Sequence, residues 1–181
     1  MAMSSSKGPS APTPQSWTEA PAGALIDHIL ERFHETHRRE GPELARAAAR
    51  LEAAHDPDPN WPRGLAALVD RITKDLVTHM AKEELVVFPR MRRGGGAPLD
   101  RPLAVLHAEH DEHTEALRTL GRMTQGFEPP VSADADWRTL YADLARFASD
   151  LAEHVRFEDD VLFPRFEPAA PMASAASVSG G

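Results

Sequence analysis

The sequence contains no cysteine in its 181 residues. This absence excludes disulfide bonds, zinc fingers built on thiolates, cysteine-ligated iron–sulfur clusters and the covalent attachment of c-type haem. Nine histidines and 28 acidic residues are present. Any bound metal ion must therefore be held by imidazole and carboxylate groups, which are suitable ligands for iron, zinc and manganese.

Basic residues are also in short supply, because 20 Lys and Arg face 28 Asp and Glu and give a formal net charge of −8. A net negative charge disfavours binding to the phosphate backbone of nucleic acids. No stretch approaches the roughly 20 apolar residues that a membrane-spanning helix requires, and residues 1–16 lack the apolar segment of a signal peptide. We expect no nucleic-acid partner, no membrane partner and a cytoplasmic location.

Large side chains are scarce at both ends of the chain. Residues 1–16 and 168–181 consist mainly of Ser, Pro, Ala and Gly. Such segments bury too little apolar surface to offset the entropy cost of ordering them. We expect two disordered tails that flank one domain at residues 17–167.

Regular alternation of apolar and polar residues is missing from this domain, whereas apolar residues recur at three- and four-residue spacings almost throughout. The pattern predicts an all-α domain. Loop-forming residues divide it into four long helices, over about 21–54, 62–88, 100–125 and 136–163. Gly41-Pro42 predicts a kink in the first helix, and Pro89 and Pro164 predict the ends of the second and fourth. Short connections between the helices predict an antiparallel up-down-up-down four-helix bundle.

Two of these helices carry a histidine and a glutamate inside an otherwise apolar stripe. His79 and Glu83 continue the three- and four-residue spacing of the second helix, and His154 and Glu158 continue that of the fourth. An unpaired buried carboxylate costs several kcal/mol, and two of them would also repel each other. Metal cations between the carboxylates are the simplest remedy.

An internal duplication relates the same two helices. The segment DLVTHMAKEELVVFPR at 75–90 aligns without gaps with DLAEHVRFEDDVLFPR at 150–165. Each copy is preceded by a His-x-x-His pair, at 34–37 and at 110–113. Two helical hairpins related by a pseudo-two-fold axis would bring both sets of residues to one central point. The duplication therefore predicts two metal ions.

Helical geometry indicates which histidines can reach this point. At about 1.5 Å of rise per residue, the two His-x-x-x-Glu motifs and the His-x-x-His pairs lie at matching heights. Helical phase alone slightly favours His37 over His34 as the ligand from the first helix. His55 lies 21 residues beyond His34, roughly 31 Å along a continuous helix. We therefore exclude His55 as a ligand unless the chain reverses at Gly41-Pro42.

Four segments carry a family resemblance: IDHILERFHETHRR, HMAKEELVVFPRM, AEHDEH and HVRFEDDVLFPRF, in that order. From about Leu25 to Phe166 the chain resembles the hemerythrin-like (HHE) cation-binding family, and within it the di-iron proteins of the iron–sulfur cluster repair group. The resemblance implies two non-haem iron ions with an oxo or hydroxo bridge. It implies four terminal imidazole ligands, two for each iron, and two bridging carboxylates: His34, His79, His110, His154, Glu83 and Glu158. It also selects His34 over His37.

The chain departs from the patterns of related proteins in two respects. Repair proteins commonly carry an N-terminal module with cysteines, and a role that needs this module is not expected here because the sequence has no cysteine. Hemerythrin oxygen carriers are expected to have a fifth histidine ligand and an Asp on the last helix, where this chain has Glu158. Fewer imidazoles leave more open coordination positions, which favours small-molecule reactivity or iron release over oxygen carriage. Only Glu31-x-x-His34 fits the Glu-x-x-His motif of ferritins, so we set a ferroxidase aside.

Five further residues are candidates to contact the ligands: Asp75, Asp150, Glu109, His37 and His113. Asp75 and Asp150 each precede a ligand histidine by one turn. A carboxylate there can either accept the second imidazole N–H or line a route to the metal. His37 and His113 fit solvated flanks and hydrogen-bonded interior positions equally well.

Together these features predict a non-haem di-iron protein that binds NO, or else O₂ or peroxide, in a nitrosative or oxidative stress response. We expect it to support the repair of iron–sulfur centres by donating iron, with an iron–sulfur protein or a reductase as its partner. Binding without catalytic turnover is the favoured interpretation. A carrier or sensor module for O₂ or NO, and a di-iron NO or peroxide reductase, remain the alternatives. Manganese or zinc could occupy the same ligands.

Overall fold

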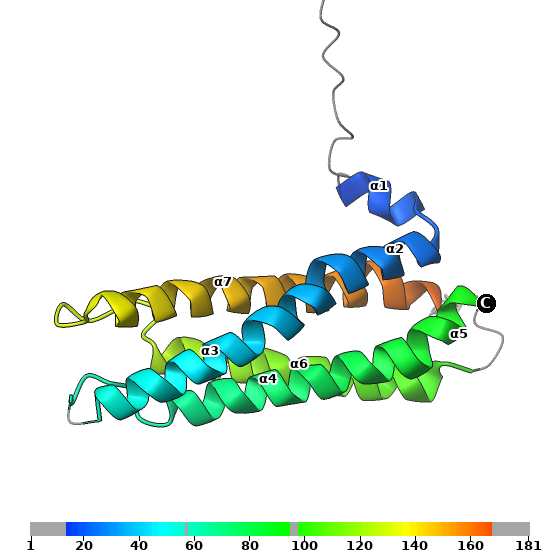
Figure 1. The fold of residues 1–181 in the computed structure, drawn as a ribbon. Helices are drawn as coiled ribbons and strands as arrows, with labels where there is room; N and C mark the ends of the chain where they lie inside the picture. The colour runs from blue at the N-terminus through cyan, green and yellow to red at the C-terminus, as the bar shows by residue number, and fades with distance from the viewer. Residues whose placement is uncertain (1–13, 57, 95–97, 168–181) are drawn as a thin grey trace, which may run out of the picture.

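The structure, a computed structural model, describes residues 14–56, 58–94 and 98–167. Every regular element in these ranges is a helix (Figure 1), which confirms the prediction of an all-α fold. The α-helices are α1 Pro14–Glu19, α2 Ala22–His28, α3 Glu35–Ala54, α4 Leu65–Lys82, α5 Phe88–Arg92, α6 Asp100–Met123 and α7 Ala135–Phe157. They are continued by the π-helical segments η1 Ile29–His34, η2 Glu83–Val87 and η3 Glu158–Leu162, and by the 3₁₀ segment η4 Phe163–Arg165.

The helices join into four long rods that lie side by side (Figure 1). The first rod comprises α2, η1 and α3, the second α4, η2 and α5, the third α6, and the fourth α7, η3 and η4. Helix α3 packs against α4 and α7, α4 packs against α6, and α6 contacts α7. This packing is consistent with a helical bundle.

Helix α1 begins inside the predicted N-terminal tail, since it takes in residues 14–16. The rest of both predicted tails, 1–13 and 168–181, lies outside the described residues. The ring of Trp17 in α1 lies 4.4 Å from that of His28 and 5.5 Å from that of Phe157. Arg165 donates to the carbonyl of Trp17 at 2.7 Å. These contacts tie α1 to the ends of the first and fourth rods.

Acidic side chains cap the starts of two helices. Asp134 precedes α7, and its carboxylate accepts the N–H of Trp137 at 2.8 Å, one of the donors that the first turn of a helix leaves unpaired. The predicted start at residue 136 is therefore slightly late. At α4, Glu52 accepts the N–H groups of Gly64 and Ala66 at 2.7 Å each. The end of α3 thus caps the start of α4.

The prolines act only partly as predicted. Helix α3 continues through Gly41 and Pro42, so the chain does not reverse there, and the kink stays a prediction. Gly41 allows close packing, because a Cβ at this position would lie 2.9 Å from Thr73 Cγ2 of α4. Helical structure continues through Pro89 in α5 to Arg92, so the predicted end of the second helix at residue 88 was wrong. The fourth rod changes at Phe163, its predicted helix end, into the three-residue 3₁₀ segment η4, which contains Pro164. Each of these two prolines stands in the first turn of its segment, where a missing N–H costs little.

Two apolar cores fill the bundle, and buried titratable residues separate them. The larger core includes Leu44, Leu51, Leu65, Leu76, Trp137, Leu144, Phe147 and Leu151. The smaller core includes Leu25, Ile29, Phe33, Phe88, Met91, Leu106, Leu162 and Phe163. Between the two cores, every rod contributes to a polar layer: His34, His37, His79, Glu83, His110, His113, His154 and Glu158.

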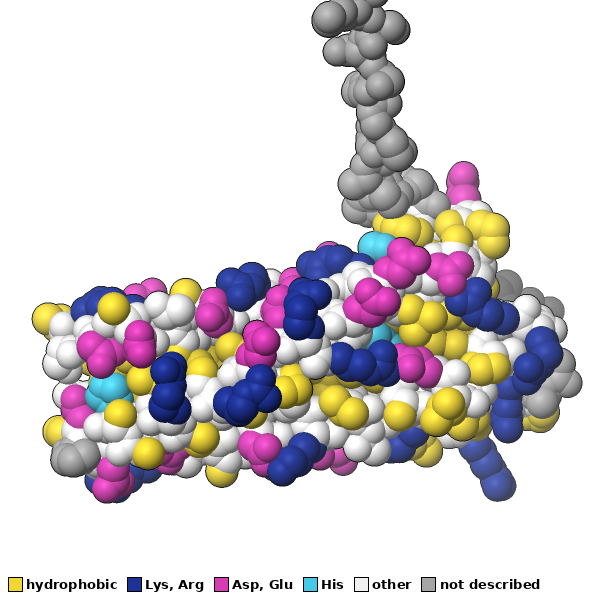
Figure 2. Space-filling view, in the orientation of Figure 1, with side chains coloured by type: hydrophobic (Ala, Val, Ile, Leu, Met, Phe, Trp, Pro, Cys, Tyr) yellow, Lys and Arg dark blue, Asp and Glu magenta, His cyan; other side chains and the backbone are white. Residues whose placement is uncertain are grey.

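Charged side chains cover the outside of the molecule. On the face drawn in Figure 2, Lys and Arg are interspersed with Asp and Glu along the whole bundle, and little histidine is visible. The acidic excess of the sequence is therefore not gathered into one patch on this face. Among the residues that the structure describes, no helix combines the length and the apolarity needed to cross a membrane.

Candidate metal centre

Three π-helical turns lie at the polar layer. Segment η1 ends at His34, η2 begins at Glu83 and η3 begins at Glu158. The N–H of Phe88 donates to the carbonyl of Glu83, and the corresponding bond in η3 has the same spacing. Turns of this kind are frequent at functional sites, and the extra residue in the turn rotates the side chains that follow it about the helix axis.

The sequence carries a signal that could have predicted two of these turns. A proline ring inside an α-helix clashes with the carbonyl four residues earlier. For Pro89 and Pro164 that carbonyl belongs to η2 and η3, respectively. A wider turn before the proline avoids the clash. The duplicated pattern Glu-[Asp/Glu]-x-Val-x-Phe-Pro therefore favours a π-turn that begins at its glutamate.

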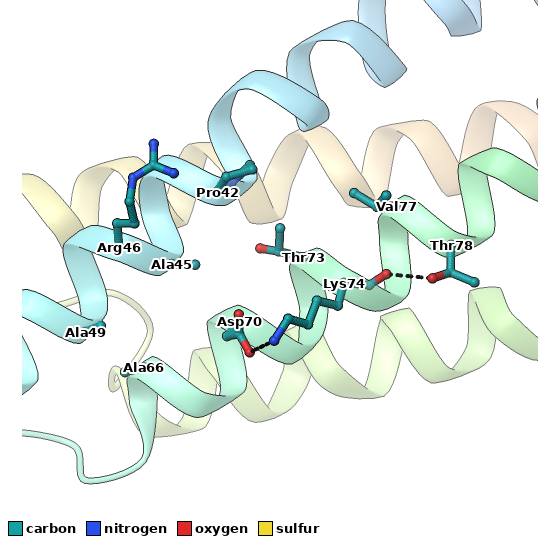
Figure 3. A pocket seen from close by; sticks show the side chains of 10 residues that line it. All are labelled: Pro42, Ala45, Arg46, Ala49, Ala66, Asp70, Thr73, Lys74, Val77 and Thr78. Carbon is teal, nitrogen blue, oxygen red and sulfur yellow. Dashed lines mark hydrogen bonds and ion pairs between the residues drawn. The ribbon is translucent and has the colours of Figure 1, made fainter.

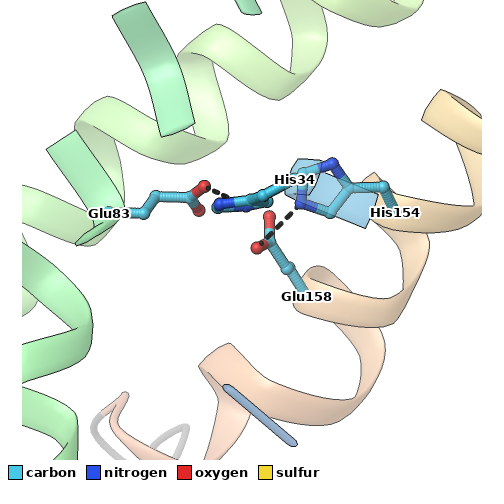
Figure 4. A group of neighbouring side chains, drawn as sticks. All are labelled: His34, Glu83, His154 and Glu158. Atoms are coloured by element: carbon cyan, nitrogen blue, oxygen red, sulfur yellow. Dashed lines mark hydrogen bonds and ion pairs between the residues drawn. The ribbon is translucent and has the colours of Figure 1, made fainter. Parts of the chain in front are cut away.

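The structure brings together all six residues that the resemblance implies as ligands. They form two overlapping groups, each with its candidate ligand atoms within 4.8 Å of one another. Group A consists of His34, Glu83, His154 and Glu158 (Figure 4), and group B of His79, Glu83, His110 and Glu158. The two glutamates belong to both groups. None of the six side chains is more than 2% exposed.

The imidazole Nε2 atoms face the two shared carboxylates. In group A, His34 Nε2 lies 3.3 Å from Glu83 Oε2, and His154 Nε2 lies 3.2 Å from Glu158 Oε1. In group B the two imidazoles lie 3.5 Å and 3.1 Å from the same carboxylates. Figure 4 shows the four side chains of group A pointing toward one another, with His154 and Glu158 extending from the fourth rod and Glu83 from the second. Nitrogen and oxygen atoms thus converge on one interior region.

Acidic residues hold three of the four imidazoles from the outside. Nδ1 donates to a carboxylate in each case: His34 to Glu84 at 2.6 Å, His79 to Glu109 at 2.9 Å and His110 to Asp159 at 2.8 Å. Such bonds fix the tautomer and the ring orientation, so that Nε2 points inward. Nδ1 of the fourth imidazole, His154, is buried without a hydrogen-bond partner among the described residues.

Two of these three acidic residues were not identified from the sequence. Glu109 was among the candidates to contact a ligand, whereas Glu84 and Asp159 were missed. In the duplicated pattern, Glu84 directly follows Glu83 and Asp159 directly follows Glu158. Their matching positions in the two copies are the signal that could have found them.

Asp75 and Asp150 do not accept an imidazole N–H, so that interpretation was wrong. Asp150 pairs with Arg32 at 2.9 Å. Asp75 is exposed, and no hydrogen bond within the described ranges joins it to an imidazole. The reason is that the Nδ1 atoms face neighbouring rods, which a side chain one turn earlier on the same rod does not reach. A role of either residue along a route to the metal stays a prediction.

His37 and His113 occupy interior positions beside the two groups, with 1% and 4% of their surface exposed. Their rings lie 5.4 Å from that of His154 and 5.1 Å from that of His79, respectively. Burial lowers the pKa of both to about 3, so both are neutral. Neither is a member of group A or group B. Both ring nitrogens of His37 and Nε2 of His113 lack a hydrogen-bond partner in the described part of the chain.

The placement of His55 agrees with its exclusion as a ligand. Its Nε2 lies 3.2 Å from Asp134, and its ring stacks on that of Trp61 near the start of α7. His107 lies closer to the centre, with Nδ1 at 2.9 Å from Asp159. A third group of candidate ligand atoms, His107, His110 and Asp159, shares its buried imidazole with group B.

Burial and mutual repulsion set the charge of the two central carboxyl groups. Burial raises the pKa of Glu83 well above its usual range, and the neighbouring Glu158 raises it further. Burial also opposes the ionisation of Glu158, but His154 and His110 outweigh it and lower the pKa of Glu158 below its usual range. Without a cation, the pair therefore favours one ionised and one protonated carboxyl group.

The imidazoles of the two groups differ in their protonation. Burial lowers the pKa of His34 and of His79 to about 4. Burial acts in the same direction on His110, but Asp159 and Glu158 outweigh it and raise its pKa to about 9. Two imidazoles are therefore already in the neutral form that a metal ion requires, whereas metal binding at His110 would release a proton.

Several candidate ligand atoms of the cluster have no hydrogen-bond partner among the described residues. Both oxygens of Glu83, Oε2 of Glu158 and Nε2 of His34 are buried without a hydrogen bond to any described residue. Buried polar atoms without partners are costly and call for an ion or another explanation. Imidazoles together with carboxylates suit iron, zinc or manganese. The cluster can therefore hold metal cations, and its two overlapping groups offer places for two.

A surface groove elsewhere on the molecule contains none of these residues. It lies between α3 and α4 (Figure 3), where Pro42, Ala45 and Ala49 line one side and Thr73 and Val77 line the other. Its lining is mainly apolar, without histidine or glutamate. The candidate metal centre is thus an interior site rather than a surface groove.

The all-helical fold and the buried cluster define a metal-binding helical protein. Residues 25–166 match the Hemerythrin HHE cation binding domain, and the chain belongs to this family. The iron-sulfur cluster repair protein YtfE of Yersinia pseudotuberculosis serotype IB (strain PB1/+) is 40% identical over 151 residues, which cover 83% of this chain and 68% of that protein. YtfE of Yersinia pestis (strain Pestoides F) matches with the same identity and coverage. The resemblance inferred from the motifs is confirmed.

Proposed function

We propose that the chain is a non-haem di-iron protein, with two iron ions joined by an oxo or hydroxo group and by Glu83 and Glu158. The terminal ligands are the four imidazoles whose Nε2 atoms face those carboxylates: His34 and His154 at one ion, His79 and His110 at the other. The observation that carries the proposal is the convergence of six buried side chains into two groups that share both carboxylates.

The proposal includes the antiparallel up-down-up-down topology of a hemerythrin-type bundle. Its support is the packing of successive rods, α3 with α4, α4 with α6 and α6 with α7. Each rod also contributes one of the four imidazoles. A bundle of this kind allows facing helices to build a metal site in its core.

The surrounding residues would control the orientation of the ligands and their access to water. Burial of Glu83 and Glu158 keeps bulk water from the shared carboxylates. Acceptors on Nδ1 hold three imidazoles with Nε2 inward, and the apolar cores on both sides keep the rods at a fixed spacing. A bound iron pair would supply the capacity to bind NO, O₂ or peroxide and to change between ferrous and ferric states.

The role that we assign to this centre is protection against nitrosative and oxidative stress in the cytoplasm. The chain would bind NO, and it would supply iron to damaged iron–sulfur proteins. The assignment is supported by the relatives, which are named iron-sulfur cluster repair proteins. With two imidazoles for each ion, the proposed centre would also leave open coordination positions, which favour small-molecule reactivity or iron release over oxygen carriage.

Stopped-flow spectroscopy of the reduced, iron-loaded protein with NO tests this function. We expect a stable dinitrosyl spectrum and no nitrous oxide. Release of nitrous oxide would instead assign catalytic turnover to the centre. An absence of any spectral change would remove NO from the proposed function.

Substitution of a shared carboxylate tests the two-ion centre itself. Because a bridging group holds both ions, we expect Glu83→Ala and Glu158→Ala each to lower the iron content of the loaded protein to half or less. Elemental analysis after anaerobic loading and desalting measures this content. Asp160→Ala is the matched control, because it removes an exposed carboxylate on the same turn as Glu158. Full iron content in both glutamate variants would contradict the bridging assignment.

A further inference from the structure

The internal duplication gives most residues of the candidate centre a counterpart in the other half of the chain. Alignment of residues 75–90 with 150–165 pairs Glu84 with Asp159, each directly after a central glutamate. Both residues accept the Nδ1 hydrogen bond of an imidazole on the preceding rod, at 2.6 Å and 2.8 Å. In this hydrogen bond the two halves of the centre match.

The residue in front of each His-x-x-His pair breaks this equivalence. Glu109 precedes the pair at 110–113, whereas Phe33 precedes the pair at 34–37. Glu109 accepts the Nδ1 hydrogen bond of His79 at 2.9 Å. The corresponding position in the other half has a phenyl ring, which offers no carboxylate acceptor.

Phe33 presents its ring face to His154, the counterpart of His79. The two rings stack with 5.1 Å between their centroids and 10° between their planes. Nδ1 of His154 therefore stays buried with no hydrogen-bond partner inside the described ranges. The outer nitrogen of His154 thus lacks the carboxylate partner that its counterpart His79 has.

The imidazole without a carboxylate acceptor on Nδ1 belongs to group A. Both imidazoles of group B, His79 and His110, donate to a carboxylate. In group A, within the part of the chain that the structure describes, only His34 does so. A carboxylate on the outer N–H raises the basicity of an imidazole ligand and holds its ring in place, and loss of such a partner typically lowers metal affinity about 10- to 100-fold.

We infer that the two metal sites are unequal, with group A binding its ion about 10- to 100-fold more weakly than group B. The inference rests on the proposed function, because it requires that both groups bind iron. One equivalent of iron then fills group B first, and the first iron to leave a loaded chain leaves group A. Phe33 is the residue that sets this order, and group A is the source of any iron that the chain donates.

Two variants, each lacking one of the two aligned imidazoles, compare the sites directly. His154→Ala leaves both imidazoles of group B in place, and His79→Ala leaves both imidazoles of group A. Anaerobic titration with Fe(II) against a competing coloured chelator gives the dissociation constant of the site that remains. We expect the His154→Ala protein to hold one iron about 10- to 100-fold more tightly than the His79→Ala protein. Equal dissociation constants would overturn the inference but leave a two-site centre, whereas failure of the unmodified chain to bind iron would reject the proposed function.

Substitution of Glu109 or Phe33, the residues that differ between the two halves, gives a second test. It measures the rate of iron release while all six proposed ligands are present. Chelator-driven release of Fe(II) from the loaded chain should show a fast and a slow phase. Glu109→Leu should accelerate the slow phase at least about 10-fold, whereas the control Phe33→Leu should leave the two phases unequal, because leucine supplies no acceptor. Circular dichroism establishes that both variants are folded. A slow phase that Glu109→Leu does not change would contradict the inference.

Discussion

The larger core and the polar layer are buried to the same degree but for different physical reasons. Leu144 and Leu151 of the larger core are 0% exposed, and apolar side chains of this kind gain free energy from burial itself. Glu83 and Glu158 of the polar layer are also 0% exposed. Burial of a carboxylate is unfavourable unless hydrogen bonds or cations compensate it, and neither oxygen of Glu83 has a hydrogen-bond partner among the described residues.

The comparison teaches that the polar layer is held in place by its neighbours. The apolar cores on both sides supply the packing that keeps the four rods together. Residues of the polar layer follow the same three- and four-residue spacing as the cores. Their side chains, however, are His and Glu instead of apolar residues. Its stability should therefore depend on cations and on pH, whereas that of the larger core should depend on shape and volume.

Removal of metal should destabilise the fold, and it should act through the polar layer. An ion that binds only the folded chain stabilises it by about 4 kcal/mol when free metal exceeds the dissociation constant 1,000-fold. We expect a chelator to lower the midpoint of denaturant-induced unfolding and Fe(II) to restore it. Circular dichroism should show that the helices persist, because the apolar cores remain. An unchanged midpoint would mean that the layer needs no cation.

A cavity in the larger core should weaken the fold without affecting the centre. We expect Leu144→Ala to lower the free energy of unfolding by about 2–5 kcal/mol, since Leu144 is fully buried. The loss, measured by denaturant titration, should be the same with and without metal. Leu144→Met is the matched control and should cost less than about 1.5 kcal/mol. A lower iron content per folded chain in Leu144→Ala would show that the two regions are coupled.

Acid should destabilise the metal-free protein through its buried imidazoles. Burial lowers the pKa of His34 and His79 to about 4, and of His37 and His113 to about 3. Between pH 6.5 and these values the unfolded chain binds more protons than the folded chain, so stability that is present above pH 6.5 is lost as the pH falls. Each imidazole contributes up to about 1.4 kcal/mol per pH unit. Glu83 acts in the opposite direction. Its pKa is raised in the folded chain, so the folded chain binds this proton at a higher pH than the unfolded chain and gains stability as the pH falls.

Substitution of one imidazole isolates its share of this effect. We expect His113→Leu to make the dependence of unfolding free energy on pH shallower by up to about 1.4 kcal/mol per pH unit below pH 6.5. Denaturant titrations of the metal-free protein between pH 4.5 and 7 measure the slope, with about 0.5 pH units between points. Leu144→Ala should keep the slope of the unmodified chain. An equal slope for His113→Leu would contradict the assignment of a buried, neutral imidazole.

The sequence was sufficient for features that depend on spacing along one helix. The stripes that carry His79 with Glu83 and His154 with Glu158 predicted where each rod meets its neighbours, because residues three and four positions apart share a helix face. The same spacing predicted an all-α fold. Contacts between rods were harder to predict, as the wrong interpretation of Asp150 shows.

The choice between His34 and His37 shows why a regular helix was not enough. Helical phase slightly favoured His37, yet the structure places His34 in group A and His37 outside both groups. The π-helical segment η1 ends at His34, and its wider turn changes the phase that a regular α-helix assumes. The family resemblance selected His34 because it compares sequence motifs and does not depend on phase.

By itself the sequence determined the donor chemistry, the apolar stripes and the duplication, since these follow from residue identity and from spacing along the chain. Only the tertiary structure decided which acidic side chain accepts the Nδ1 hydrogen bond of which imidazole. It also decided that the His154 ring stacks on Phe33, while Nδ1 of His154 has no carboxylate acceptor among the described residues. The physical reason is that such contacts depend on the rotation and height of one rod against another. Three π-turns and the packing of two apolar cores set those quantities.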